Sequence, residues 1–120
     1  KRIPRGSRYY SGPRPFSEPE SRVARELILR VRPRLSVWFH QPERNVRDAQ
    51  SAAQARRYAR LVGLPFLPLP TPPGAATAWT KAHVSGSVAF VVELPAGSAS
   101  PAVVRTHANA LRTLAAAERR

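Results

Sequence analysis

The sequence has no cysteine and no methionine, and its only lysines are Lys1 and Lys81. Without cysteine, neither a disulfide nor a thiolate metal site can form. The absence of cysteine is compatible with a reducing and with an oxidising compartment, and therefore with the cytoplasm and with secretion. No run of about 18 apolar residues occurs, which argues against a membrane-spanning segment. The first residue is lysine rather than methionine, so we expect a processed product or a piece of a longer polypeptide.

Acidic residues are also scarce, since seven acids stand against 20 lysines and arginines and give a formal net charge of +13. Such a charge raises the hypothesis of a basic, non-catalytic module that binds nucleic acid or another anionic polymer. However, the arginines are dispersed along the chain rather than gathered in a block, and no nucleic-acid motif accompanies them. This dispersion favours a solvated surface, and the binding module is kept as the alternative function.

The 120 residues correspond to about one domain. Apolar periodicity and turn residues predict helices over 18–31, 49–62 and from 101 onward, and buried strands at 35–40 and 87–93. We expect an irregular lead-in over 1–16, a polar loop over 42–48, an extended crossing over 64–74 and at most one short helical turn within 75–82. This order of elements indicates an α/β fold.

Three helix ends carry recognisable signals. Ser17 and Glu20 have the spacing of a capping box before the first helix. Ser100 precedes Pro101 at the start of the last helix, which is a favoured arrangement for an N-cap and first helical residue. Gly63 has the position of a C-cap after the second helix.

Two polar residues stand at the ends of the predicted strands, His40 at the end of LSVWFH and Glu93 at the end of SVAFVVE. A buried acid is unfavourable unless it is paired or used chemically. In open α/β sheets, sites form at the carboxyl ends of strands. Imidazole is a common zinc ligand, and a carboxylate beside it can serve as a general base. On spacing alone, His40 could instead bond a loop, and Glu93 could pair with an arginine.

Other residues carry weaker signals. His83 is expected at the surface and His107 in a half-buried position on the last helix. Ser36 and Ser87 have no catalytic-triad context. The chain contains no His-x-x-Glu, no His-Glu-x-x-His, no Gly-rich phosphate loop and no Gly-x-Ser-x-Gly motif.

Three segments taken together carry a resemblance to a known family. They are YYSGPRPFSEPES at 9–21, SVWFHQP at 36–42, and TPPGAATAW followed by GSVAFVVELPAG within 71–97. In this order and spacing they resemble the zinc carboxypeptidase family, closest to the bacterial branch of murein peptide amidases and peptidoglycan-peptide carboxypeptidases. The resemblance implies an α/β/α sandwich around a mixed, mostly parallel sheet. Residues 17–120 would be the C-terminal half of the catalytic domain.

The resemblance also implies roles for single residues. His40 matches the downstream ligand of the family's single Zn²⁺ ion. Glu93 matches the general base, which activates the zinc-bound water and then protonates the leaving amine. Asp48 lies where related amidases often carry an acid in the loop that lines the substrate pocket. The implied substrate is a peptide, with a cell-wall muropeptide as the specific expectation.

The departures from the family matter equally. The upstream His-x-x-Glu motif and the Asn and Arg that hold the substrate carboxylate have no counterpart in residues 1–8. A catalytic zinc ion needs three protein ligands, and this chain offers one. We therefore expect the chain to be inactive alone and to depend on a partner piece, the missing N-terminal half of the domain. A degenerate, non-catalytic family member would have the same sequence features.

Overall fold

The computed structural model describes residues 4–7, 10, 12–50, 52–70 and 74–117, and the chain divides into two compact units. Among its described residues, the first unit, Lys1–Arg32, contains one helix, α1 (Pro19–Val31). The second unit, Pro33–Arg120, contains all the remaining helices and strands of the described residues. None of the described helices combines the length and apolar character that a membrane crossing requires.

The predicted first helix is confirmed, but its predicted capping box is wrong. The N-cap residue is Glu18, which has extended backbone and no side-chain cap. The Ser17 hydroxyl donates instead to the Glu18 carboxylate, at 2.8 Å, so it does not reach the backbone of the first turn. Pro19 occupies the first turn, where its missing N–H leaves no bond unmade.

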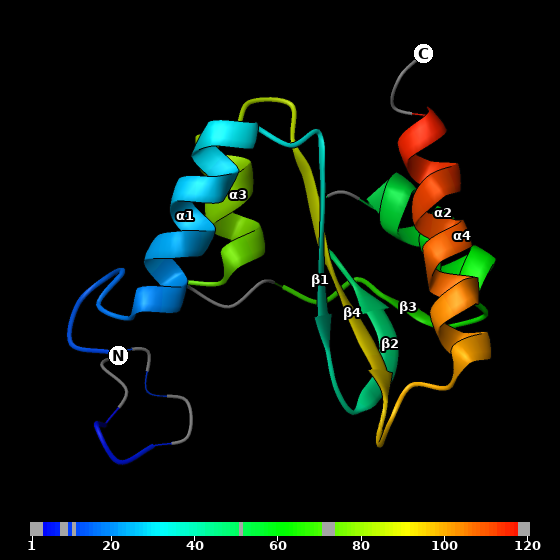
Figure 1. The fold of residues 1–120 in the computed structure, drawn as a ribbon, viewed down its shortest axis with the longest axis horizontal. Coiled ribbons are helices and arrows are strands. Elements are labelled where there is room, and N and C mark those ends of the chain that lie inside the picture. Colours follow the sequence, from blue (N-terminus) through cyan, green and yellow to red (C-terminus); the bar gives the residue numbers. More distant parts are fainter. Residues whose placement is uncertain (1–3, 8–9, 11, 51, 71–73, 118–120) are drawn as a thin grey trace. The chain divides into compact units, whose positions relative to one another are not determined.

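A four-stranded sheet with the order β1-β4-β2-β3 forms the centre of the second unit (Figure 1). The predicted strands are confirmed as β1 (Leu35–His40) and β4 (Val88–Pro95), which pair in parallel. β2 (Glu43–Arg47) pairs antiparallel with β4 and parallel with β3 (Phe66–Leu67). The sheet is therefore mixed and mostly parallel, and the predicted α/β fold class is confirmed.

The prediction of a polar loop over 42–48 is wrong, because β2 runs through it. Its sequence, ERNVR, has three charged residues and one apolar residue, Val46, so it lacks the pattern of a strand. Val46 is completely buried, and β2 has hydrogen-bonded neighbours on both sides. Backbone pairing within the sheet therefore outweighs the weak strand preference of these residues.

The remaining helices are α2 (Ala52–Val62), α3 (Ala76–His83) and α4 (Pro101–Ala117). α2 begins later than predicted, and α3 is an eight-residue helix rather than a single turn. The predicted caps of the other helices are confirmed. Gly63 has a φ of 68°, and the N–H of Leu64 donates to Ala59 O at 3.0 Å. The Ser100 hydroxyl accepts from the N–H of Val103 at 3.3 Å.

Helices cover both faces of this sheet, with α2 and α4 together on one face and α3 on the other (Figure 1). The apolar core lies on the α2 and α4 face. Its buried members come from these two helices and from alternate residues of β2 and β4, and they are Val46, Ala55, Tyr58, Ala59, Phe90, Val92, Ala110 and Leu114. Because strand side chains alternate between faces, the residues between these positions point toward the α3 face.

His107 lies at the edge of this core and bonds to a buried tyrosine, as expected of a half-buried structural histidine. Its Nδ1 lies 2.7 Å from the Tyr58 hydroxyl, and its ring meets Phe39 edge-on at 5.8 Å between centroids. Burial lowers the pKa of His107 below its usual 6.5, because the charged imidazolium loses hydration there. Burial likewise raises the pKa of Tyr58, so the hydroxyl stays protonated.

We therefore expect the free energy of unfolding to fall as the pH drops below about 6.5. As the pH falls, the unfolded state binds a proton at His107 at a higher pH than the folded state does. The contribution of neutral His107 to the free energy of unfolding is therefore complete above pH 6.5, and it is lost as the pH falls through the lower folded-state pKa. Urea denaturation between pH 8 and pH 5 measures the effect. A His107→Gln variant is the control and should show a flatter dependence. The same slope in both proteins would contradict this role of His107.

Candidate functional site

His40 and Glu93 lie side by side near the carboxyl ends of two adjacent strands: His40 is the last residue of β1, whereas β4 continues two residues beyond Glu93 to Pro95. β1 and β4 run parallel, and their register pairs Leu35 with Val88 through to His40 with Glu93. Residues paired in this way direct their side chains to the same face of a sheet. For His40 and Glu93 this is the α3 face, because the alternate residues Phe90 and Val92 belong to the core on the opposite face.

Glu93 is a buried carboxylate, with a residue exposure of 6%. Its Oε1 lies 3.9 Å from Nη1 of Arg47, the cation that forms an ion pair with it. Its Oε2 is buried and has no hydrogen-bond partner among the described residues. A carboxylate in this setting is charge-compensated on one side only, so the second oxygen keeps its capacity to accept a proton or a hydrogen bond.

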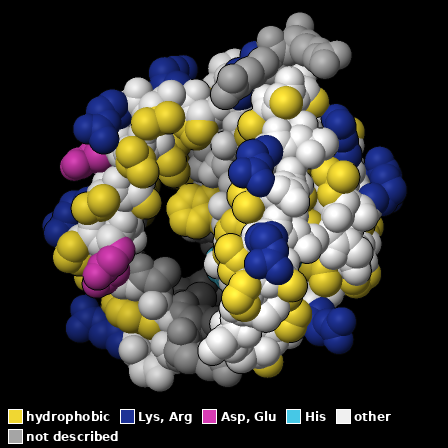
Figure 2. Space-filling model, turned by 45° about the vertical axis from the view of Figure 1, so that its right-hand side comes forward, with side chains coloured by type: hydrophobic (Ala, Val, Ile, Leu, Met, Phe, Trp, Pro, Cys, Tyr) yellow, Lys and Arg dark blue, Asp and Glu magenta, His cyan; other side chains and the backbone are white. Residues whose placement is uncertain are grey.

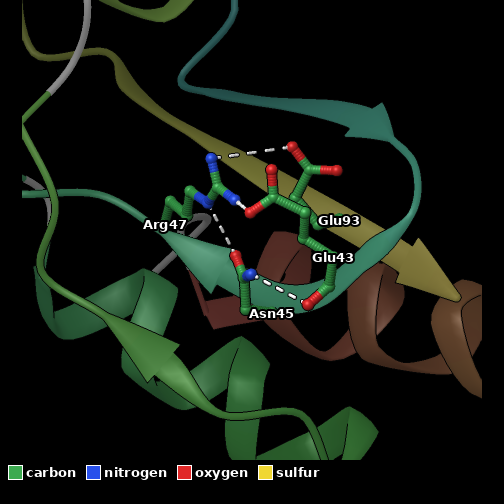
Figure 3. A network of polar contacts seen from close by, with 4 residues as sticks. All are labelled: Glu43, Asn45, Arg47 and Glu93. Carbon is green, nitrogen blue, oxygen red and sulfur yellow. Dashed lines mark hydrogen bonds and ion pairs between the residues drawn. The ribbon is translucent and has the colours of Figure 1, made fainter.

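Three residues of β2 form a polar network beside this carboxylate, and Arg47 is the member that contacts it (Figure 3). Nε of Arg47 donates to Oδ1 of Asn45 at 2.8 Å, and Nη2 of Arg47 forms an ion pair with Glu43. Nδ2 of Asn45 donates to the backbone carbonyl of Glu43 at 3.0 Å. Glu43, Asn45 and Arg47 are spaced two residues apart, which places them on one face of the strand, and Asn45 lies in register with Glu93.

These β2 residues were not identified from the sequence. The segment ERNVR has a single apolar residue, and Arg44 occupies the position that would have to be apolar for a strand-like alternation, so the sequence predicts a loop there. The sequence also could not have shown which strand lies beside β2, because the pairing with β4 joins residues nearly 50 positions apart.

A complete metal site is not present among the described residues, which contain no cluster of three or more potential histidine, cysteine, aspartate or glutamate ligands. His40 is exposed, and within the described part of the chain no hydrogen bond or ion pair engages its imidazole. The other histidines are occupied elsewhere: His83 stacks on Trp79 at the end of α3, and His107 bonds to Tyr58. The residues present fit part of a zinc site, one imidazole with a neighbouring carboxylate, but not a full ligand set.

Asp48, expected as an acid that lines a substrate pocket, takes part in a buried ion pair. Its Oδ1 accepts from Nζ of Lys81 on α3 at 2.7 Å and from the backbone N–H of Gln50 at 3.2 Å. The side chains of Asp48 and Lys81 are 1% and 11% exposed. The pair joins the end of β2 to α3, close to the face that carries Glu93.

The basic residues give little support to a nucleic-acid interface. On the face shown in Figure 2, lysine and arginine side chains lie apart from one another rather than in one block. Arg56 packs its guanidinium 4.4 Å from the centre of the Phe66 ring, so one exposed arginine of α2 has a local structural contact. A protein that binds an anionic polymer along a groove is expected to gather its basic side chains on one continuous surface.

Comparison with solved structures finds the same fold in the crystal structure of murein-tripeptide amidase MpaA from Escherichia coli O157. The TM-score is 0.68 and the sequence identity is 27%, over 88% of this chain. The match covers 44% of that chain, so this chain spans less than half the length of the amidase. No protein-family model and no curated protein matches the sequence. The structural match confirms the predicted resemblance to the zinc carboxypeptidase family, over part of its domain.

Proposed function

We propose that this chain, whose fold is that of part of a zinc-carboxypeptidase-family amidase, is the C-terminal half of a peptide hydrolase domain. In this proposal residues 17–120 supply the general base and one metal ligand. The observation that carries the proposal is the register of β1 and β4, which brings His40 and Glu93 together near the carboxyl ends of two parallel strands. Glu93 is a buried carboxylate with an ion-pair partner at one of its two oxygens, and the His40 imidazole lies beside it. Such a pair can supply a general base and a metal ligand.

Glu93 is the proposed catalytic residue. Hydrolysis of an amide needs a proton to leave the attacking water and another to reach the departing nitrogen. The Oε2 atom of Glu93, which has no hydrogen-bond partner among the described residues, can accept the first proton and then deliver it to the leaving amine. Burial keeps bulk water away from this oxygen, so that the proton passes to the leaving amine rather than to solvent.

His40 is the proposed zinc ligand of this chain. Its imidazole is exposed and unengaged by any hydrogen bond or ion pair in the described residues, so it can bind a metal without first breaking a contact. One imidazole does not hold a catalytic zinc ion, and the remaining ligands would have to come from residues other than those described here. On this basis the isolated 120-residue chain is expected to be inactive.

The proposed substrate class is a peptide, with the murein tripeptide as the specific candidate. This candidate rests on the matched protein, a murein-tripeptide amidase at 27% identity. The test uses the full-length product of the gene that encodes this chain, assayed on murein tripeptide and on an unrelated tripeptide with a free carboxylate. We expect zinc-dependent release of the terminal residue, faster from the murein tripeptide. Hydrolysis of neither peptide would overturn the proposal.

Replacing His40 with alanine should lower the zinc content of the same full-length protein to well below one ion per molecule. The physical reason is that loss of one of three protein ligands leaves an incomplete and weakly binding site. Zinc is measured by atomic absorption after dialysis. His83→Ala is the matched control, because His83 stacks on Trp79 away from the proposed site. Full zinc occupancy in the His40 variant would remove it as a ligand.

A further inference from the structure

We propose that Arg47 is the positioning residue of Glu93, and that Asn45 holds Arg47 in place for this task. The inference rests on the proposed function, because it assigns the support of the same general base. It goes beyond the His40 and Glu93 pair by giving β2 a role in the chemistry. The observations that carry it are the distances, the burial and the arrangement of charges in the network of Figure 3.

The first observation is the environment of the carboxylate. Glu93 is 6% exposed, and Nη1 of Arg47 lies 3.9 Å from its Oε1. No other ion pair with Glu93 occurs within the described residues, so Arg47 provides its charge compensation there. An ionised carboxylate at this depth is strongly disfavoured without such a partner.

The second observation is that Arg47 is itself held in a defined orientation. Its Nε bonds to Asn45 Oδ1 at 2.8 Å, and its Nη2 pairs with Glu43. Asn45 is 4% exposed, and its own Nδ2 bonds to the Glu43 carbonyl. Contacts at two separate nitrogens fix the plane of a guanidinium group, so that the third nitrogen, Nη1, is directed toward Glu93.

The third observation separates a positioning role from direct binding of substrate. All three guanidinium nitrogens of Arg47 already face a partner in the network, and the side chain is 25% exposed. Two carboxylates, those of Glu43 and Glu93, accompany this single cation, so the cluster has a net negative charge. Such a cluster does not attract an anionic substrate group, whereas it does hold a carboxylate in one orientation.

The consequence for Glu93 is an unequal pair of oxygens. Oε1 faces Arg47, whereas Oε2 is buried with no hydrogen-bond partner in the described part of the chain. The charge interaction restricts the carboxylate rotation and leaves Oε2 as the oxygen available for proton transfer. Loss of Arg47 would therefore misplace the base without removing it.

The kinetic test uses the full-length gene product and compares Arg47→Gln with Arg60→Gln. Arg60 is an exposed arginine of α2, so its replacement makes the same charge change away from the site. We expect Arg47→Gln to lower kcat by about 10- to 100-fold, because small displacements of a catalytic group have effects of that size. KM should stay within about twofold, since Arg47 does not touch substrate. Arg60→Gln should leave both constants unchanged.

Two further variants keep the test decisive if Arg47→Gln folds poorly. Arg47→Lys keeps the charge but has one nitrogen, so it cannot bond Asn45 and face Glu93 together, and it should recover kcat only in part. Asn45→Ser should lower kcat in the same direction. Full recovery by lysine, or a raised KM with unchanged kcat, would overturn the positioning role.

A structural readout separates failure of this inference from failure of the proposed function. The ¹³C signals of the glutamate carboxyl carbons are recorded, with Glu93 assigned from a Glu93→Gln variant. Arg47→Gln should shift the Glu93 signal and leave those of Glu20 and Glu26 in place, whether or not the protein hydrolyses peptide. An unmoved Glu93 signal overturns the inference. A moved signal in a protein that hydrolyses no peptide overturns the proposed function and, with it, the catalytic meaning of the contact.

Discussion

Replacing Glu93 with glutamine should reduce kcat of the full-length protein by about 10²- to 10⁴-fold, the usual contribution of a general base. Glutamine has nearly the same shape as glutamate but cannot accept the proton of the attacking water. The Arg47 guanidinium can still contact the amide oxygen at this position, so the side chain should remain in place. Zinc content should be unchanged, because Glu93 is the proposed base and not a metal ligand.

The matched control is Glu26→Gln, which removes an exposed carboxylate of α1. It should leave kcat, KM and zinc content as in the wild-type protein. The measurement is initial-rate kinetics on murein tripeptide together with zinc analysis of each variant. Turnover retained in the Glu93→Gln protein would remove Glu93 as the base, and loss of zinc would indicate a ligand instead.

Replacing Phe90 with alanine should lower the free energy of unfolding by about 3–5 kcal/mol. Phe90 is completely buried at the centre of the sheet, and its ring lies 5.3 Å from that of Tyr58. Alanine would remove the ring from the packed face between β4 and the two helices that cover it. Because a domain of this size is stable by only about 5–15 kcal/mol, this loss is a large fraction of the total.

Phe39→Ala is the matched control for this prediction. Phe39 lies on the neighbouring strand β1, but it is 42% exposed, so its truncation removes less buried apolar surface and leaves a smaller cavity. We expect its effect to stay below about 1.5 kcal/mol. Urea denaturation followed by circular dichroism measures both variants. Equal losses for the two phenylalanines would contradict the difference in burial between Phe90 and Phe39 on this face of the sheet.

The sequence was sufficient to predict the elements whose side chains carry a clear pattern. LSVWFH and SVAFVVE are apolar runs bounded by proline or glycine, and both are strands in the structure. Ser100 with Pro101 and the glycine at position 63 marked two helix ends correctly, because their local chemistry favours those conformations in most contexts. The same two runs placed His40 at the end of β1 correctly, whereas β4 extends two residues beyond the predicted end at Glu93.

The sequence was insufficient where tertiary pairing decides the outcome. β2 has a poor strand composition and is held by its two neighbours in the sheet, so no local property of ERNVR specifies it. The cap of α1 failed for a local reason, since the Ser17 hydroxyl is engaged by the adjacent Glu18. The register that pairs His40 with Glu93, and the contact of Arg47 with that carboxylate, depend on strand order and became visible only in the structure.

We propose that His40 and Glu93 form one side of a zinc-dependent hydrolytic site. Crystals of the full-length gene product, grown with zinc and measured on both sides of the zinc absorption edge, test it most directly. We predict an anomalous peak bonded to the His40 imidazole, with the Glu93 carboxylate on the same face of the sheet. A zinc peak bound only elsewhere, or a His40 imidazole that contacts no metal while zinc saturates the protein, would contradict the account.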